Sequence, residues 1–274
     1  MNVQPARTGE TSAQGLLRER DGDIAVLVLN RPKAGNSLSE AMLAALADAL
    51  ADIAADKTIR AVVVAANGPL FCAGHDLKEV TAHRADSDGG REYTRQLMQD
   101  CSAMMLAIMR LPQPVIAAVE GVATAAGCQL VATCDLAVAS KAAKFSTPGV
   151  HIGLFCSTPM VALTRNVARK HAMEMLLTGE MVPAENALGI GLINRVVAAG
   201  KAREEAIRLA RKIAAKSTAI VKLGKQAFYK QIDMDIAEAY AYASEVMVEN
   251  MMARDAEEGI DAFVEKRDPK WEDR

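Results

Sequence analysis

Aromatic residues are scarce in this 274-residue chain, at 4% with a single tryptophan, whereas methionine occurs 14 times. We therefore expect the core, and any ligand pocket, to be lined mainly by flexible methionine and leucine side chains. Neither sign of charge dominates, since 32 Lys and Arg stand against 34 Asp and Glu. Because nucleic-acid-binding domains carry a basic surface, the net charge of −2 argues against a nucleic-acid partner.

Cysteine is also rare, and the five cysteines show none of the paired spacings of a metal site. We therefore predict no metal, buried reduced thiols and a cytoplasmic location, because disulfides persist in oxidising compartments. No membrane span is predicted, since the most apolar run, 115–131, is interrupted by Glu120 and two glycines. The first 15 residues are polar, lack the apolar segment of an export signal and are expected to form a flexible tail.

What the chain does contain is an alternation of apolar strands and amphipathic helices. Segments 24–29, 61–65 and 114–119 are continuous apolar runs typical of buried strands. Helices are expected after a capping box of Ser37 and Glu40, and at about 92–109. The alternation predicts an α/β fold, although periodicity alone does not separate a doubly wound sheet from other α/β arrangements.

From about residue 157 the pattern becomes mainly helical. One helix is expected to end at Gly179, since glycine is favoured just after the last helical residue. A last short strand at 191–197 and helices at 202–215, 217–230, 232–253 and 255–266 complete the chain. We therefore divide the sequence into a tail at 1–15, a core at 16–200 and a C-terminal helical region at 201–274.

Two stretches of small residues follow apolar strands and offer backbone donors to a ligand. Ala73 and Gly74 let the backbone approach a ligand closely, and the donor that follows is the N–H of His75. The second stretch, 124–129, opens a predicted helix whose first N–H groups have no partner within the helix. Two such donors converging on one oxygen would form an oxyanion hole.

Three stretches of the sequence together resemble a known family. In order and spacing, segments 29–37, 73–77 and 121–129 are similar to the marker stretches of the enoyl-CoA hydratase/isomerase (crotonase) family. The ending, 258–267, resembles the C-terminus of that family, so the resemblance covers about 16–271. Within the family, 123–132 and 153–159 look most like the branch called enoyl-CoA hydratase domain-containing protein 3.

This resemblance implies a fold, an assembly and a substrate class. The fold would be α/β, with a crotonase-type spiral core of ββα turns and a C-terminal helical region that forms homotrimers or dimers of trimers. The substrate would be an acyl-CoA thioester, with coenzyme A as part of the substrate and no separate cofactor. The N–H groups of His75 and Ala126 would hold the thioester oxygen while an enolate forms.

The resemblance also implies three groups of contacts with coenzyme A. They are Ala73, Asp76, Leu77 and Lys78 at the pantetheine and adenine, Arg31 and Lys33 near the phosphates, and Phe263 and Lys266 toward the coenzyme A of a neighbouring subunit. Each basic side chain is equally compatible with an ordinary solvated surface position.

The two glutamates that hydratases of this family use as acid and base correspond to Gln129 and Gly149. Hydration requires one group that deprotonates water and another that delivers a proton to carbon. Glutamine does not titrate and glycine has no side chain. Since each missing acid or base typically costs a factor of about 10²–10⁴ in rate, hydration by this route is not expected.

Other groups could replace the missing carboxylates. His151 titrates near neutral pH and would project to the same side as Gly149 if the segment were extended. The side chain of His75 is a second candidate. A bound anion is a third, because family members with glycine at this position use bicarbonate. Cys128 and Cys156 neighbour the site and are interpreted as small buried thiols.

Three functions therefore stay open at the level of sequence. The first is an enzyme of the hydratase/isomerase, lyase-type class that stabilises a thioester enolate. The second is a non-catalytic acyl-CoA-binding oligomer that kept the pocket and lost the acids. The third is RNA binding, which some crotonases have and which the net charge of −2 disfavours.

Overall fold

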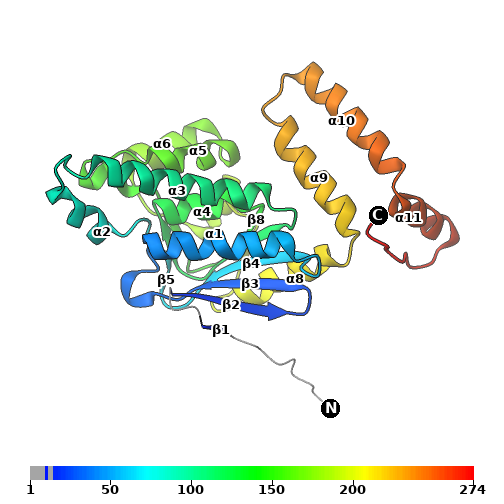
Figure 1. The fold of residues 1–274 in the computed structure, drawn as a ribbon, viewed down its shortest axis with the longest axis horizontal. Helices are drawn as coiled ribbons and strands as arrows, with labels where there is room; N and C mark the ends of the chain where they lie inside the picture. The colour runs from blue at the N-terminus through cyan, green and yellow to red at the C-terminus, as the bar shows by residue number, and fades with distance from the viewer. Residues whose placement is uncertain (1–9, 12–14) are drawn as a thin grey trace, which may run out of the picture.

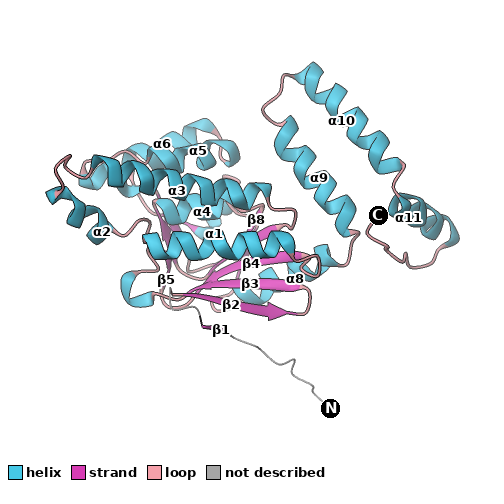
Figure 2. Cartoon of the chain, in the orientation of Figure 1, coloured by secondary structure: helices cyan, strands magenta, loops and turns pink. Residues whose placement is uncertain are grey.

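The computed structural model describes residues 10–11 and 15–274, whose strands form two sheets (Figures 1 and 2). In spatial order the larger sheet comprises β1 (Glu10–Thr11), β2 (Leu16–Asp21), β3 (Ile24–Leu29), β4 (Ala61–Ala66), β6 (Val115–Val119), β8 (Leu136–Ser140) and β11 (Arg195–Val197). The smaller sheet comprises β10 (Val182–Pro183), β9 (Lys144–Ser146), β7 (Val122–Thr124) and β5 (Leu70–Cys72).

The chain passes repeatedly from the larger sheet to the smaller one and then into a helix. β4 leads to β5, β6 leads to β7, and β8 leads to β9, with parallel pairing between the successive strands of each sheet. The helices that follow these pairs are α2 (Leu77–Ala82) and α3 (Arg91–Arg110), then α4 (Ala126–Thr133), then α5 (Ser157–Asn166). The expected spiral of ββα turns is therefore present.

Both faces of the larger sheet are covered, which explains its continuous apolar strands. Along β4, Val62 and Val64 point toward the core that includes α1 (Glu40–Ala55) and α3, while Val63 points to the opposite face. That second face packs against α8 (Ala202–Ala214) through residues such as Ala206. The alternation follows from the two-residue period of a strand.

The C-terminal helices that leave the core begin later than predicted. The sequence-based boundary at residue 200 assigned α8 to the helical region, but α8 lies on the sheet and completes its second face. The remaining helices are α6 (Arg169–Thr178), α7 (Ala184–Gly189), α9 (Thr218–Gln231), α10 (Ile236–Met251) and α11 (Arg254–Glu265). Of these, α9, α10 and α11 project from the core as an arm (Figure 1).

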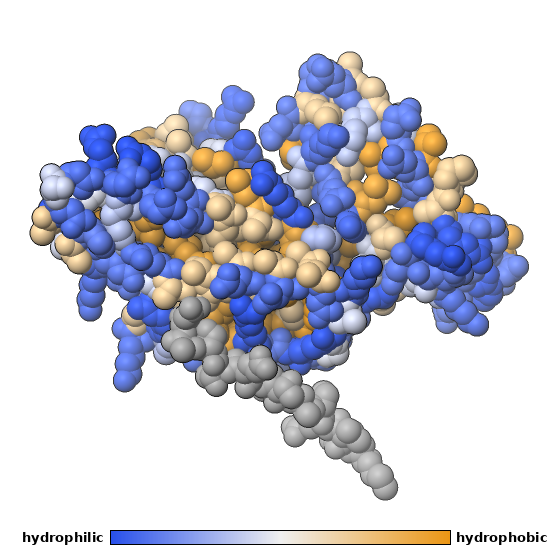
Figure 3. All heavy atoms as spheres, in the orientation of Figure 1, coloured by the Kyte–Doolittle hydropathy of each residue, from blue (hydrophilic) through white to orange (hydrophobic). Residues whose placement is uncertain are grey.

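The arm is poorly buried within a single chain. No apolar residue of α9 is buried, and α10 buries only Ala239. Its exposed apolar side chains include Phe228, Tyr240 and Val248, which are 54, 72 and 57% exposed. Figure 3 shows hydrophobic residues interspersed with hydrophilic ones over this arm. An apolar surface of this kind is typical of a contact with another molecule.

A buried ion pair ties the arm to the core. Lys225 Nζ of α9 lies 2.7 Å from Asp135 Oδ2, with side chains only 7 and 15% exposed. The ammonium also donates to the carbonyls of Ile108 and Gln113, and Tyr229 donates to Asp135 Oδ1 at 2.8 Å. Burial lowers the pKa of Lys225, and the charge of Asp135 opposes this effect. The carboxylate of Asp135 and the ammonium of Lys225 are thus both hydrogen-bonded within the protein at the base of the arm.

Two local predictions need correction or have limited coverage. The N-cap of α1 is Ser39, whose hydroxyl accepts from Met42 N, and not Ser37, which instead donates to Asp76. The predicted tail falls outside the described residues, apart from β1, which pairs with β2, and Gly15.

The helix end at Gly179 is confirmed, since this residue adopts a φ of 66° as C-cap. Within residues 10–11 and 15–274, no helix has the length and apolarity to cross a membrane.

Candidate active site

The two predicted donor stretches lie side by side because they follow neighbouring parallel strands. Leu70 pairs with Val122, and Cys72 with Ala123, so the loops after β5 and β7 emerge at the same edge of the smaller sheet. Gly74 makes their close approach possible. Its φ is 96°, and a Cβ on it would lie 2.9 Å from Ala125 Cβ and 3.3 Å from Ala126 N.

The N–H of His75 is directed away from the neighbouring segment. The backbone bridge to that segment uses the flanking groups, because Leu38 N donates to Gly74 O at 2.8 Å and Asp76 N donates to Leu38 O at 3.4 Å. Successive backbone groups of an extended chain alternate in direction, so the His75 N–H points to the other side. Among the described residues it donates to no protein acceptor.

The second donor is held by a strained turn. Ala125 adopts a φ of 50° and a ψ of −120°, a conformation favoured by glycine. Hydrogen bonds fix it from both sides, since Ala125 N donates to Ser146 O and Gln129 N donates to Ala125 O, each at 3.0 Å. Ala126 is therefore the first residue of α4, and its N–H lies at the positive end of the helix without an intrahelical acceptor.

Further contacts fix the spacing of the two loops. Thr124 Oγ1 donates to the carbonyl of Ala73 at 3.1 Å. Gly127 lies so close to β5 that a Cβ on it would be 2.2 Å from Cys72 O. Any side chain there would push α4 away from the strand. The distance between the two donor loops is thus set by packing of the main chain.

The segment before α1 supports the His75 loop through Arg31. Its guanidinium lies 2.6 Å from Ser39 Oγ and 3.3 Å from Asp76 Oδ2, and it is 29% exposed. Asp76 also accepts from Ser37 Oγ and, as N-cap of α2, from Lys78 N. Within this chain Arg31 therefore contacts the loop itself, whereas the resemblance implied a position near phosphates.

Four buried polar atoms around the loops have no protein partner. Six such side-chain atoms occur in the described part of the chain, and four of them belong to His75, Gln129, Ser146 and Thr147. Gln129 is 6% exposed with Oε1 unpaired, and the Oγ atoms of Ser146 and Thr147 are equally unpaired in residues that are 0 and 1% exposed. Buried polar groups are normally paired, so this concentration marks a place that receives a polar ligand or water.

The position of Gly149 is occupied by other groups. A Cβ on Gly149 would lie 3.0 Å from both Cys156 Sγ and Leu154 O, so a larger residue requires the neighbouring backbone to shift. The segment is a 3₁₀ helix, Pro148–Ile152, and is not extended as the His151 prediction assumed. His151 is exposed and its Nε2 donates to the carbonyl of Thr178 at 2.8 Å. This side chain caps α6 and does not share the direction expected for Gly149.

The side chain of His75 is half-buried beside the loops. Burial lowers the pKa of its imidazole below the ordinary value of 6.5, so the ring is neutral at pH 7. Its unpaired Nε2 can accept or donate one hydrogen bond in that state, depending on the tautomer. The described residues contain no group of three His, Cys, Asp or Glu side chains arranged to hold a metal ion.

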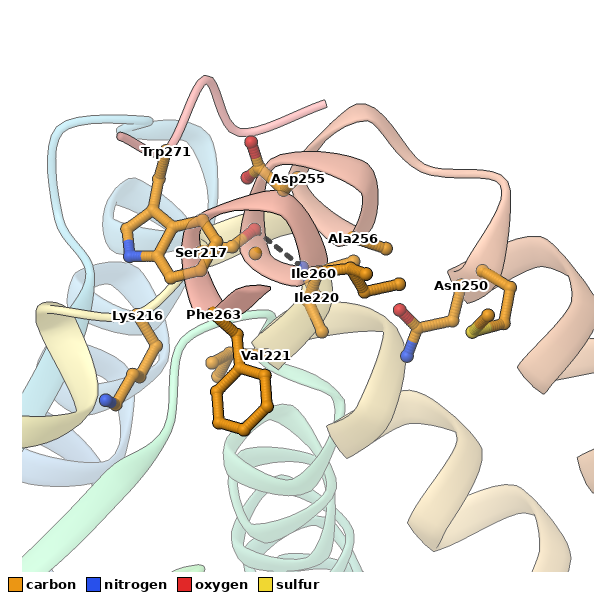
Figure 4. Close-up of a pocket in the computed structure, with 12 residues that line it drawn as sticks. Lys216, Ser217, Ile220, Val221, Asn250, Asp255, Ala256, Ile260, Phe263 and Trp271 are labelled. Atoms are coloured by element: carbon orange, nitrogen blue, oxygen red, sulfur yellow. Dashed lines mark hydrogen bonds between the residues drawn. The ribbon is translucent and has the colours of Figure 1, made fainter. Parts of the chain in front are cut away.

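The other residues expected to contact coenzyme A fall into two separate places. Lys33, Ala73, Leu77 and Lys78 are exposed near the His75 loop. Phe263, 85% exposed, lines a groove of about 530 Å³ formed by α9, the end of α10, α11 and Trp271 (Figure 4). Lys266 is the C-cap of α11. Figure 1 places α11 at the opposite end of the molecule from α2, so this pair does not reach the same chain's loop.

Comparison with known proteins agrees with this arrangement. A sequence profile described as enoyl-CoA hydratase/isomerase matches residues 19–274. The chain belongs to the enoyl-CoA hydratase/isomerase family. It is 49% identical to the proteins named enoyl-CoA hydratase domain-containing protein 3, mitochondrial, of Rattus norvegicus and Homo sapiens, over 93% of this chain and 83 and 82% of theirs.

Solved structures of the family share the fold. A structure of human enoyl Coenzyme A hydratase domain-containing protein 3 has a TM-score of 0.88 at 47% identity, covering 94% of this chain and 100% of that one. A structure titled enoyl-CoA hydratase of Mycobacterium smegmatis has a TM-score of 0.86 at 52% identity, covering 98 and 99%. The predicted family, branch and fold are confirmed; the names of the relatives include "mitochondrial", and a cytoplasmic location of this chain stays a prediction.

Several residues of the site were not singled out by the sequence. Ser39 and Thr124 hold the loops through hydroxyl groups, and Ser146 and Thr147 place unpaired hydroxyls beside them. Isolated serines and threonines carry no spacing signal. Cys156 was interpreted only as a buried thiol because its closeness to Gly149 depends on a turn at 153–155.

Proposed function

We propose that the protein binds an acyl-CoA thioester and stabilises negative charge on the thioester oxygen through the N–H groups of His75 and Ala126. The observation that supports the proposal is the close approach of the two loops. A Cβ placed on Gly74 would lie only 3.3 Å from Ala126 N. Two preorganised backbone donors on one oxygen favour enolate formation, because the oxygen gains charge in the transition state.

The activity is of the hydratase/isomerase type but does not use two glutamates. Gln129 supplies an uncharged amide, and Gly149 supplies no side chain in a space bounded by Leu154 O. Efficient hydration of an enoyl thioester therefore requires an acid and a base from elsewhere. Coenzyme A enters as part of the substrate, with no separate cofactor.

A non-catalytic acyl-CoA-binding oligomer is the second candidate function. It is favoured by the same two positions, since a protein that only binds a thioester needs the backbone donors but no titrating group at residues 129 and 149. Binding without turnover would then be the whole function. The two candidates share the oxyanion hole and differ in what happens at the α- and β-carbons.

We further propose a homotrimer or dimer of trimers in which the arm covers a neighbouring chain. The exposed apolar residues of the arm support this, as does the position of Phe263 and Lys266 far from their own chain's His75 loop. In such an assembly the pair would reach the coenzyme A of another subunit. Light scattering of the purified protein tests it: a monomer at micromolar concentration would reject this assembly.

The experiment for the function combines binding and turnover. Calorimetry with acetoacetyl-CoA is expected to show a 1:1 complex per chain, because its polarised carbonyl matches the two donors. Turnover of crotonyl-CoA, followed by loss of enoyl absorbance, is expected to be far below that of a two-glutamate hydratase, by roughly 10²–10⁴ per missing group. Absence of binding would reject both candidate functions and leave family membership as a statement about fold.

A further inference from the structure

A buried amide lies in the stretch that leads into α1. Asn36 is 0% exposed and adopts a φ of 51°, and it directly follows Gly35, whose φ is 62°. A left-handed conformation is uncommon for residues other than glycine, and asparagine is among the few that adopt it. Burying an amide also costs free energy unless its polar atoms are paired. Position 36 therefore meets two demands, one on the backbone and one on the side chain.

The side chain of Asn36 is paired with main-chain groups on both of its polar atoms. Its Oδ1 accepts from Arg31 N at 2.7 Å. Its Nδ2 donates to the carbonyls of Asn67 and Leu70, at 2.9 and 2.7 Å. Since an amide has two N–H donors, both have an acceptor. Asn36 thus joins the turn before α1 to the connection between β4 and β5.

The residues that follow this turn hold the first donor loop. Residues 35–38, the template segment, are hydrogen-bonded to the loop at two points. Ala73 N donates to Gly35 O at 2.9 Å, and Leu38 N donates to Gly74 O at 2.8 Å. Packing is equally close, because a Cβ on Gly35 would lie 3.1 Å from Ala73 Cβ. The donor loop therefore follows any displacement of the template segment.

We propose that Asn36 is a positioning residue for the oxyanion hole. Its amide holds the template segment in place, and the template segment sets the position of the His75 N–H relative to that of Ala126. Asn36 acts through main-chain hydrogen bonds and does not touch the thioester. This proposal rests on the proposed function, because it needs a thioester oxygen between the two donors.

Two substitutions separate the backbone demand from the amide. Asn36→Gly permits the left-handed conformation without strain but removes the hydrogen-bonding side chain. Asn36→Asp keeps the shape and the acceptor for Arg31 N, but an ionised carboxylate offers no donor to the carbonyls of Asn67 and Leu70. If the amide positions the loop, both variants impair the site. If only the backbone conformation matters, Asn36→Gly behaves as the wild type.

Infrared spectroscopy of bound butyryl-CoA labelled with ¹³C at its carbonyl gives the direct readout, because a displaced donor polarises the carbonyl less. The wild type is expected to lower the stretching frequency relative to the free ligand. Asn36→Gly and Asn36→Asp are expected to lose roughly half of this shift, since one of two donors is displaced. Asn67→Gly is the matched control. It removes an exposed amide that donates to Asn30 Oδ1 at 3.0 Å, and it should keep the full shift.

The outcomes distinguish positioning from a purely structural role and from failure of the proposed function. A loss of stability alone leaves the frequency unchanged in the molecules that are folded and bound. If the wild type shows the shift and Asn36→Gly retains all of it, the role of Asn36 is rejected and the oxyanion hole stands. If the wild type shows no shift, the proposed function fails as well.

Hydrogen exchange in the wild type, followed by nuclear magnetic resonance, decides the question if neither Asn36 variant folds. Coupling between two sites is reciprocal, so a ligand held by the donor loop also stabilises the contacts that position the loop. Saturating acetoacetyl-CoA is expected to slow exchange roughly tenfold at Leu38 N–H and at the Nδ2 hydrogens of Asn36. Arg60 N–H, which donates to Asp23 O at the opposite end of β4, is the control and should slow less. Equal slowing at all three sites, or none, would overturn the proposal.

Discussion

The two halves of the candidate site differ in what they are made of. In the proposed function, the half that would receive the thioester oxygen consists of the main-chain N–H groups of His75 and Ala126, whereas the half that would face the acyl carbons consists of side chains. The first half has the two backbone N–H groups that the family resemblance implies. In the second, Gln129 and Gly149 stand where two carboxylates are expected. Charge stabilisation is thus built into the fold, while proton transfer depends on replaceable side chains.

Packing explains why the first half resists change. Gly74 and Gly127 sit where a single additional carbon would collide with the opposite loop, at 2.9 Å from Ala125 Cβ and 2.2 Å from Cys72 O. In the second half, Leu154 O and Cys156 Sγ lie close to Gly149, each 3.0 Å from a Cβ placed there.

Gly74→Ala is expected to have the largest effect. The new Cβ meets Ala125 at a φ of 96°, which forces the two donors apart. Affinity for acetoacetyl-CoA should fall by roughly 10- to 100-fold, the scale of one hydrogen bond to a charged oxygen. Gly89→Ala is the matched control, since Gly89 also has a positive φ of 68° but nothing within 4 Å. Equal affinity in both variants, measured by calorimetry, would contradict the account of the first half.

Gln129→Glu and Gly149→Glu probe the second half. Glutamate at 129 replaces a buried amide of similar shape and should raise crotonyl-CoA hydration by about 10²-fold over the wild type. Glutamate at 149 would place its Cβ 3.0 Å from Leu154 O and require that backbone to shift, so Gly149→Glu should give a smaller gain. Loss of enoyl absorbance measures both. A larger gain from the 149 variant would show that the site is not filled as described.

Lys225→Ala changes the base of the arm while leaving both halves of the site untouched. The substitution leaves the buried carboxylate of Asp135 without its cation, and this should lower the free energy of unfolding by about 3 kcal/mol. Lys222→Ala, at an exposed position one turn earlier on α9, should lie within about 0.5 kcal/mol of the wild type. Guanidinium denaturation distinguishes the two, and equal stabilities would mean that the pair does not anchor the arm.

The smallest expected effect is a pH dependence far from the site. Hydrogen bonds from Arg208 and Arg195 lower the pKa of Glu205 to about 2, from 4.5. A lowered folded-state pKa stabilises the protein above about pH 4.5, and this contribution is lost as the pH falls toward 2. Glu205→Gln should therefore lose less stability between pH 5 and 2 than the wild type. Parallel stability curves in urea would contradict this.

The sequence located the two donor loops better than the strands around them. The loops at 73–75 and 124–129 could be located because small residues after apolar strands have a recognisable pattern, and the family resemblance then singled out Ala126. β5, β7 and β9 were missed, since three residues are too few for a periodic signal. These are the strands that bring the donor loops together. Local pattern therefore located the residues, while pairing between distant segments set their geometry.

Predictions that depended on side-chain direction fared worse. His151 was expected beside Gly149 on an extended segment, but the 3₁₀ helix turns it toward Thr178. That Arg31 lies near phosphates stays a prediction; within this chain its guanidinium contacts Asp76. The boundary at residue 200 failed because the apolar face of α8 matches a sheet face that the sequence does not reveal.

The central claim is that two backbone N–H groups polarise the thioester carbonyl, and isotope-edited infrared spectroscopy tests it most directly. With butyryl-CoA labelled with ¹³C at its carbonyl, the stretching frequency of the bound thioester is expected to lie below that of the free ligand. In Gly74→Ala the shift should be lost for any ligand that still binds. A bound carbonyl with the frequency of free butyryl-CoA in the wild type would contradict the claim.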